Sequence, residues 1–222
     1  MTQAVTCPIS GETEREEYVN TWTHFIGLVL GFIGWMVLLV RTWQAGDIKH
    51  FTSCAVYGLT LVLLYAASTY YHACRSLSQK RLMRIADHSC IFLLIAGTYT
   101  PFAVGPLHQA GGWELLYLEW SIAFVGIVFK FFAIDKLRIL STLAYIAMGW
   151  LVVFTLPSLM AEMSLAAFVW LMAGGVAYTV GTVFYAWENL PFSHAVWHVF
   201  VLAGSICHYF AIYCIVPELT TW

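Results

Sequence analysis

Two histidines spaced four residues apart in PFSHAVWH are the first candidates for chemistry in this sequence. On a helix, His194 and His198 would point their imidazoles to the same side, as zinc ligation requires. A third histidine, His72, ends the distant segment ASTYYH. Three histidines would leave the fourth position of a tetrahedral zinc ion free for water or substrate, as in catalytic zinc sites. We therefore predict a Zn²⁺ site formed by His72, His194 and His198.

Two further polar residues are candidates for catalytic roles. Ser68 precedes His72 by four residues, so on a helix it would reach the bound water or substrate and help to hold a developing oxyanion. Asp87 is a candidate to accept a hydrogen bond from a ligand histidine, or to act as a base. Each has a structural alternative. The Ser68 hydroxyl could bond to its own helix backbone, and Asp87 could pair with Arg84 or Arg81.

Glu17, Asn20 and His24 are three and four residues apart and therefore share one face of a helix. We expect them to support the metal ligands or brace the bundle, with His24 bracing rather than touching the metal. His208 lies ten residues beyond His198, about 15 Å further along a helix. That distance is too large for the same site, so we predict an interior packing or hydrogen-bonding role.

The composition indicates that these residues sit in a membrane protein. The chain has 222 residues, of which 61% are hydrophobic and 10% charged, whereas soluble domains carry about 25% charge. The mean hydropathy is +0.78. A net charge of −2 without a basic cluster argues against nucleic acid as a partner.

Seven apolar segments are long enough to cross a bilayer as helices. They cover roughly residues 21–40, 51–74, 87–105, 113–133, 139–157, 164–186 and 193–216. The sequence thus predicts an all-α bundle of seven transmembrane helices, with a polar tail at 1–20 and one membrane domain at 21–222. Glu119 and Lys130 fall inside the fourth segment, near its ends, where charged side chains can reach the interface.

The distribution of lysine and arginine predicts the orientation, because cytoplasmic loops carry the excess. Eight lie on one side, namely Arg15, Arg75, Lys80, Arg81, Arg84, Lys130, Lys136 and Arg138, against Arg41 and Lys49 on the other. We therefore expect a cytoplasmic N-terminus and, after seven spans, an outside C-terminus. In that topology four polar clusters lie at one depth, near the cytoplasmic leaflet: Glu17 with Asn20 and His24, Ser68 with His72, Asp87 with His88, and His194 with His198. A shared site explains this agreement better than scattered core histidines.

The same segments carry a family resemblance over most of the chain. The matching stretches are EEYVNTWTH, ASTYYHA, ADHSCIFLLIAGTYTPF, AYIAMGWL and FSHAVWHVFVLAGSICH, in this order between residue 16 and about residue 213. The chain resembles the bacterial hemolysin III family, within the progestin and adipoQ receptor group that includes the adiponectin receptors. The resemblance implies a multi-pass protein of the bacterial inner (plasma) membrane, with zinc on His72, His194 and His198 and with Asp87 and Ser68 beside the metal.

Three functions follow from these observations. The leading one is a zinc hydrolase that acts on a lipid amide or ester, as alkaline ceramidases of the wider superfamily do, with membrane lipid as the substrate. The second is a non-enzymatic receptor or regulator of membrane lipid and energy homeostasis, in which the metal pins two helices together. The third is a cytolysin or transporter, against which the chain lacks a ladder of charges through the bilayer.

Overall fold

The computed structural model describes residues 6–134, 138–187 and 189–216, and its named elements are all helical. Their bounds in chain order are α1 Glu14–Gln44, α2 Ile48–Ala73, α3 Leu77–Val104, α4 Gly112–Ala133, α5 Arg138–Gly149, η1 Leu151–Thr155 (a 3₁₀ turn), α6 Leu156–Glu162, α7 Leu165–Ala186 and α8 Ser193–Ile215. Lys136, used above for the orientation, lies outside the described residues, as do 1–5 and 217–222 at the outer ends of the two predicted domains.

Polar caps determine where the first two helices begin. Thr13 accepts a hydrogen bond from the Glu16 amide at 3.3 Å, and the Glu16 carboxylate accepts one from the Thr13 amide at 2.9 Å. Asp47 accepts from two amides in the first turn of α2. Such caps satisfy amides that have no partner within the helix. Because α1 begins at Glu14, the last part of the predicted polar tail is already helical.

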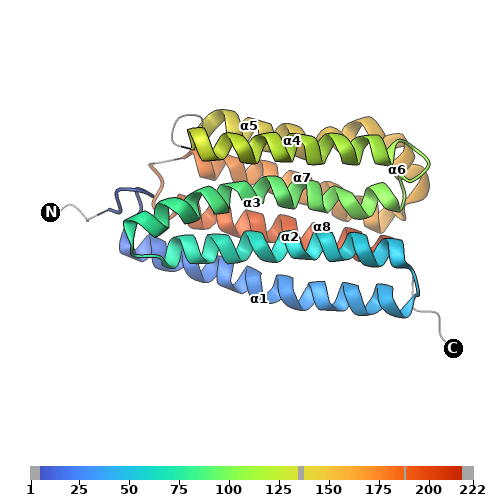
Figure 1. Cartoon of the computed structure of the whole chain (residues 1–222), viewed down its shortest axis with the longest axis horizontal. Coiled ribbons are helices and arrows are strands. Elements are labelled where there is room, and N and C mark those ends of the chain that lie inside the picture. Colours follow the sequence, from blue (N-terminus) through green and yellow to red (C-terminus); the bar gives the residue numbers. More distant parts are fainter. Residues whose placement is uncertain (1–5, 135–137, 188, 217–222) are drawn as a thin grey trace.

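The long helices run side by side along one axis (Figure 1). Within the described residues, six helical stretches are long and apolar enough to cross a membrane, and one of them combines α5, η1 and α6. The 28-residue α3 is long enough but starts with a polar stretch, and it packs between α2 and α4. With α3 included, the predicted seven-span bundle fits the architecture. The predicted third span began at 87, whereas α3 begins at Leu77.

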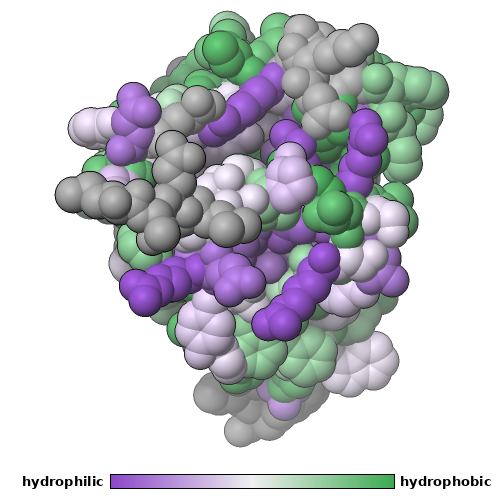
Figure 2. Space-filling view, turned by 90° about the vertical axis from the view of Figure 1, so that its left-hand side faces the viewer, coloured by the Kyte–Doolittle hydropathy of each residue, from purple (hydrophilic) through white to green (hydrophobic). Residues whose placement is uncertain are grey.

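Most of the helices begin or end at one end of the molecule, which we call the N-terminal end of the bundle. There α1, α3, α5 and α8 begin and α2, α4 and α7 end (Figure 1). Hydrophilic side chains gather on this end (Figure 2). Helix α8 ends at the opposite end of the bundle (Figure 1). The four predicted polar clusters therefore share one depth, while the side of the membrane that this end faces stays a prediction.

Glycines allow the helices that carry the site to approach closely. A Cβ at Gly27 of α1 would lie 2.4 Å from the Tyr65 ring of α2, and one at Gly174 of α7 would lie 2.1 Å from the His208 ring of α8. Only a residue without a side chain fits at such distances, which is how small residues act in membrane helix packing. Aromatic rings seated on glycines thus fix the spacing of α1 against α2 and of α7 against α8.

Candidate metal centre

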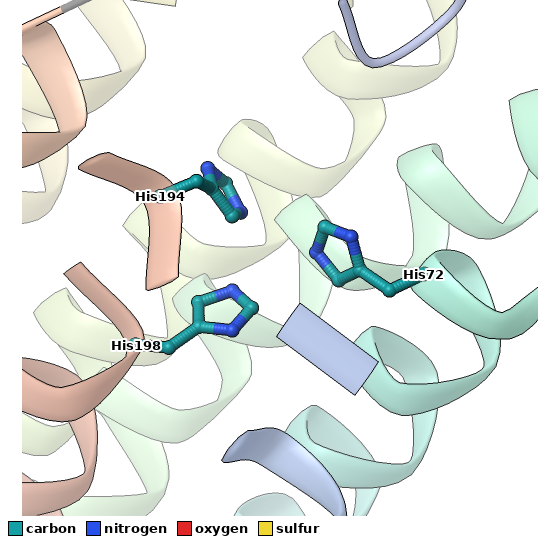
Figure 3. Close-up of side chains that lie close together, drawn as sticks. All are labelled: His72, His194 and His198. Atoms are coloured by element: carbon teal, nitrogen blue, oxygen red, sulfur yellow. The ribbon is translucent and has the colours of Figure 1, made fainter. Parts of the chain in front are cut away.

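Three histidines converge at the N-terminal end of the bundle. His72 comes from the last turn of α2, and His194 and His198 come from successive turns at the start of α8 (Figure 3). One ligand atom from each lies within 4.8 Å of the others. The ring centroids are 5.0 Å apart for His72–His194 and His72–His198, and 4.6 Å apart for His194–His198. Two segments more than 120 residues apart in sequence therefore form one cluster.

The cluster suits a metal ion. His72 and His198 are 3% and 1% exposed, and the Nε2 atom of His72 is buried without a hydrogen-bond partner among the described residues. A buried nitrogen without a partner is costly unless something binds it. Nitrogens on a tetrahedral zinc ion are about 3.4 Å apart, given bonds of about 2.1 Å, so small ring movements suffice. Three neutral imidazoles are a donor set that zinc and similar transition metals accept.

Contacts from α1 orient two of the rings. The Nδ1 atom of His72 lies 2.7 Å from Glu17 Oε2, and the Nδ1 atom of His198 lies 3.0 Å from Thr23 Oγ1. With Nδ1 engaged, Nε2 of each ring is left for a metal. The sequence suggested Asp87 as a partner for a ligand histidine, and at His72 the structure places Glu17 instead. Thr23 was not singled out, although it precedes His24 directly in the motif TWTH.

Asn20 and His24, which share a face of α1 with Glu17, are both buried. Asn20 is fully buried, and the His24 ring stacks on His198 with a centroid distance of 3.4 Å and an interplanar angle of 15°. Neither nitrogen of His24 has a hydrogen-bond partner in the described part of the chain. His24 therefore braces a ligand ring through its face and is not one of the three residues of the metal cluster.

Ser68 and Asp87 face the same cavity as His194 and His198. Ser68 is fully buried, and its hydroxyl makes no hydrogen bond to its own helix, which was the structural alternative. Asp87 is 8% exposed, and its carboxylate lies 3.9 Å from Nδ1 of His88. Both side chains are thus placed where they can meet a molecule bound beside the histidines.

The cavity extends from the histidines deep into the bundle. Its walls come mainly from α2, α3, α5, α7 and α8, and most of the lining is apolar. On α3 it runs from Asp87 to Phe102, a rise of about 22 Å. His208 lines its inner part and hydrogen-bonds through Nε2 to the Leu171 carbonyl at 3.2 Å. This is the interior hydrogen bond predicted for His208, away from the cluster.

A family model described as "Haemolysin-III related" matches residues 13–209, a range that contains every residue of the metal cluster. The chain belongs to this family. Within it, the chain is 42% identical over 211 residues to "Hemolysin-3 homolog" of Bacillus subtilis, covering 94% of this chain and 99% of that protein.

Relatives outside the bacterial branch match at lower identity. The human protein "Monocyte to macrophage differentiation factor" is 28% identical over 208 residues, with 89% of this chain and 83% of that protein covered. "Adiponectin receptor protein" of Drosophila melanogaster is 25% identical over 222 residues, with 87% of this chain and 49% of that protein covered. The family membership and the helices together establish a multi-pass membrane protein that is related to adiponectin receptors.

Proposed function

We propose that this member of the haemolysin III family is a zinc-dependent hydrolase of the bacterial inner (plasma) membrane that cleaves a lipid amide or ester. One observation carries the proposal: three histidines have ligand atoms within 4.8 Å of one another, and two of them, His194 and His198, line a long apolar cavity. Three protein ligands leave a metal with an open position, which structural zinc sites lack.

The side chains around the cluster supply the remaining parts of a hydrolytic site. Zinc bound there would acidify a water molecule and polarise a carbonyl group. Asp87 faces the cavity and would take a proton from the attacking water and return it to the leaving group. Ser68 faces the cavity with a hydroxyl that is not bonded to its own helix and would donate a hydrogen bond to the developing oxyanion. Glu17 and Thr23 would keep the His72 and His198 rings in place.

The shape and polarity of the cavity support a lipid as the substrate. A length of about 22 Å along α3 with mostly apolar walls suits an acyl chain. Among the described lining residues there is no lysine or arginine to pair with a phosphate group. The carbonyl of an amide or ester would then lie beside the histidines, with the chain extended toward Phe102.

A non-enzymatic regulator is the second candidate, favoured by the position of the cluster. The histidines join the end of α2 to the start of α8, so a metal would fasten two helices that are distant in sequence. In that case the cavity would bind lipid without cleaving it, and Asp87 would have no chemical task.

Turnover distinguishes the two candidates. The purified, zinc-loaded protein in lipid nanodiscs is incubated with fatty-acid amides and esters, and released fatty acid is measured beside an Asp87→Asn variant. We expect turnover of at least one substrate, and a loss of about 10²-fold or more in Asp87→Asn with zinc content retained. No turnover of any substrate above that of Asp87→Asn would reject the hydrolase and leave the regulator.

A further inference from the structure

Glu17 lies between two buried groups at the N-terminal end of the bundle. Its Oε2 atom is 2.7 Å from His72 Nδ1, and its Oε1 atom is 2.7 Å from Lys80 Nζ. The Glu17 side chain is 13% exposed, that of His72 1% and that of Lys80 3%. Each carboxylate oxygen thus has its own nitrogen partner, away from bulk water. The Glu17 carboxylate therefore connects the His72 imidazole to the Lys80 ammonium group, although α1 itself provides no metal ligand.

The Lys80 side chain is buried and held by several contacts. Its Nζ atom also donates to the Tyr71 carbonyl at 3.0 Å and to the His72 carbonyl at 3.4 Å. It further lies 4.8 Å from the centre of the Tyr71 ring. The ammonium group is therefore tied to the end of the helix that carries the ligand. From there it fixes the carboxylate and compensates its charge, which is costly to bury alone.

The contact with Glu17 determines which nitrogen of His72 can bind a metal. A carboxylate accepts a hydrogen bond, so the proton of the neutral ring lies on Nδ1 and the lone pair on Nε2. The Nε2 atom is the buried nitrogen that has no partner. A carboxylate in this position also makes the imidazole a stronger donor to the metal. His198 has the neutral Thr23 hydroxyl in the corresponding place.

We propose that Glu17, held by Lys80, is the positioning residue that sets how tightly the three-histidine cluster retains its metal. The inference rests on the proposed function to the extent that a metal occupies the cluster. It assigns control of metal retention to α1 and to the start of α3, two elements that contribute no ligand. Neither hydrolysis nor the identity of the lipid enters into it.

Metal release tests this role with four variants. Glu17→Gln keeps the shape and removes the charge, and Glu17→Asp keeps the charge on a shorter arm. Glu17→Gln/Lys80→Met removes both charges together, so that no buried ammonium is left unpaired. Glu14→Gln makes the same exchange at an exposed site in the first turn of α1. Each purified protein is loaded with zinc, and the rate of zinc transfer to a chromogenic chelator is measured.

We expect zinc to leave Glu17→Gln and the double variant about 10 to 100 times faster than the wild type, with partial rescue in Glu17→Asp and no change in Glu14→Gln. The metal-free double variant should unfold at the same temperature as the metal-free wild type. A purely structural role of Glu17 would instead lower the unfolding temperature of the variant. Release at the wild-type rate, or lowered stability of the metal-free double variant, would overturn the proposal. A wild-type protein that takes up no zinc would instead reject the metal site itself.

Discussion

Ser68 is buried against the cavity, and its hydroxyl makes no hydrogen bond to the backbone of its own helix. At the residue scale this makes Ser68 the side chain most available to a bound carbonyl. The contrast with Thr60 is instructive, because the Thr60 hydroxyl donates to the Tyr57 carbonyl one turn earlier at 2.8 Å. A hydroxyl on this helix can thus donate to a backbone carbonyl one turn earlier, but the Ser68 hydroxyl makes no bond of this kind.

Ser68→Ala should therefore retain zinc and lower turnover of the lipid by about 10²-fold, because one donor to the oxyanion is lost. Substrate binding should change little, since the acyl chain provides most of the contact. The matched control is Ser89→Ala, a buried serine that does not line the cavity. Equal turnover in Ser68→Ala and Ser89→Ala would remove Ser68 from the mechanism.

Residue spacing alone indicated the three histidines, because an i,i+4 pair and a third histidine at a helix end have a recognisable geometry. It did not indicate Lys80, which entered only as one of eight positive charges. Its contact with Glu17 joins the start of α3 to α1, and only the packing of the two helices creates it. For Glu119 the sequence predicted a side chain that reaches the membrane interface, whereas the structure buries it fully. The reason is that it lies on the buried face of α4, with Leu115 and Ala123.

At the element scale, the spacing of α1 and α2 matters because the two helices carry Glu17 and His72. Gly27→Ala would place a methyl group 2.4 Å from the Tyr65 ring, whose hydroxyl is held by Ser205 at 2.8 Å. We expect a loss of about 1–3 kcal/mol in the free energy of unfolding, together with faster zinc release. Thermal unfolding and the chelator assay measure the two effects.

Gly175→Ala is the control for that variant, since its added Cβ would meet its nearest neighbour, the Trp150 ring, at an ordinary 3.8 Å. Alanine should be neutral or slightly stabilising there, because it favours a helix more than glycine does. If Gly27→Ala is as stable as Gly175→Ala, close packing of α1 on α2 does not position the site.

Residues 6–12, which we call the N-terminal loop, contact the site from outside the helices. Ser10 donates to Glu17 at 2.5 Å, and Arg84 donates to the Ile9 carbonyl at 3.2 Å. This arrangement was not predicted, because residue types and spacing indicate only a polar tail in this segment. The backbone of Cys7 bonds to that of Glu12 at 2.8 Å, which folds the loop back on itself.

The N-terminal loop should loosen as the pH rises. Burial, followed by repulsion from Glu16 and Glu17, raises the pKa of Glu12 from its usual 4.5 to about 7. A group whose pKa is raised on folding stabilises the folded state fully below its unfolded pKa, and loses that contribution as the pH passes its folded pKa. Hydrogen exchange of residues 6–12, corrected for the intrinsic rate, should be faster at pH 8 than at pH 6.

Glu12→Gln should remove this difference, because the amide does not titrate. The exposed Glu14 provides the matched control, and Glu14→Gln should leave the pH dependence intact. Exchange that is independent of pH in the wild type would show that Glu12 does not report on the loop.

At the scale of the whole molecule, hydropathy predicted the number of spans and the all-helical fold. Two features escaped it. The third helix begins ten residues before its apolar part, and the fifth span is interrupted at Trp150, between α5 and the 3₁₀ turn. The Tyr99 hydroxyl accepts from the Val152 amide at 2.9 Å and donates to the Met148 carbonyl at 3.0 Å. A side chain from α3 thus bonds to backbone groups on both sides of the interruption. A local pattern does not reveal such a partner.

The orientation of the bundle is open to direct measurement. The count of positive residues predicts that the N-terminal end of the bundle, with the histidines, faces the cytoplasm. Alkaline phosphatase fused to the C-terminus should therefore be active, and the same enzyme fused to the N-terminus should be inactive. The reverse pattern would place the site at the outer leaflet and contradict the charge argument.

Metal content tests the central claim most directly. Elemental analysis of the purified protein should give about one zinc per chain, and His194→Ala should lose it because two nitrogens alone hold the ion weakly. His208→Gln serves as the control, since His208 lies in the inner cavity and bonds to Leu171. It should keep its zinc. A wild-type protein without a bound metal, or a His194→Ala variant that retains a full equivalent, would contradict the account.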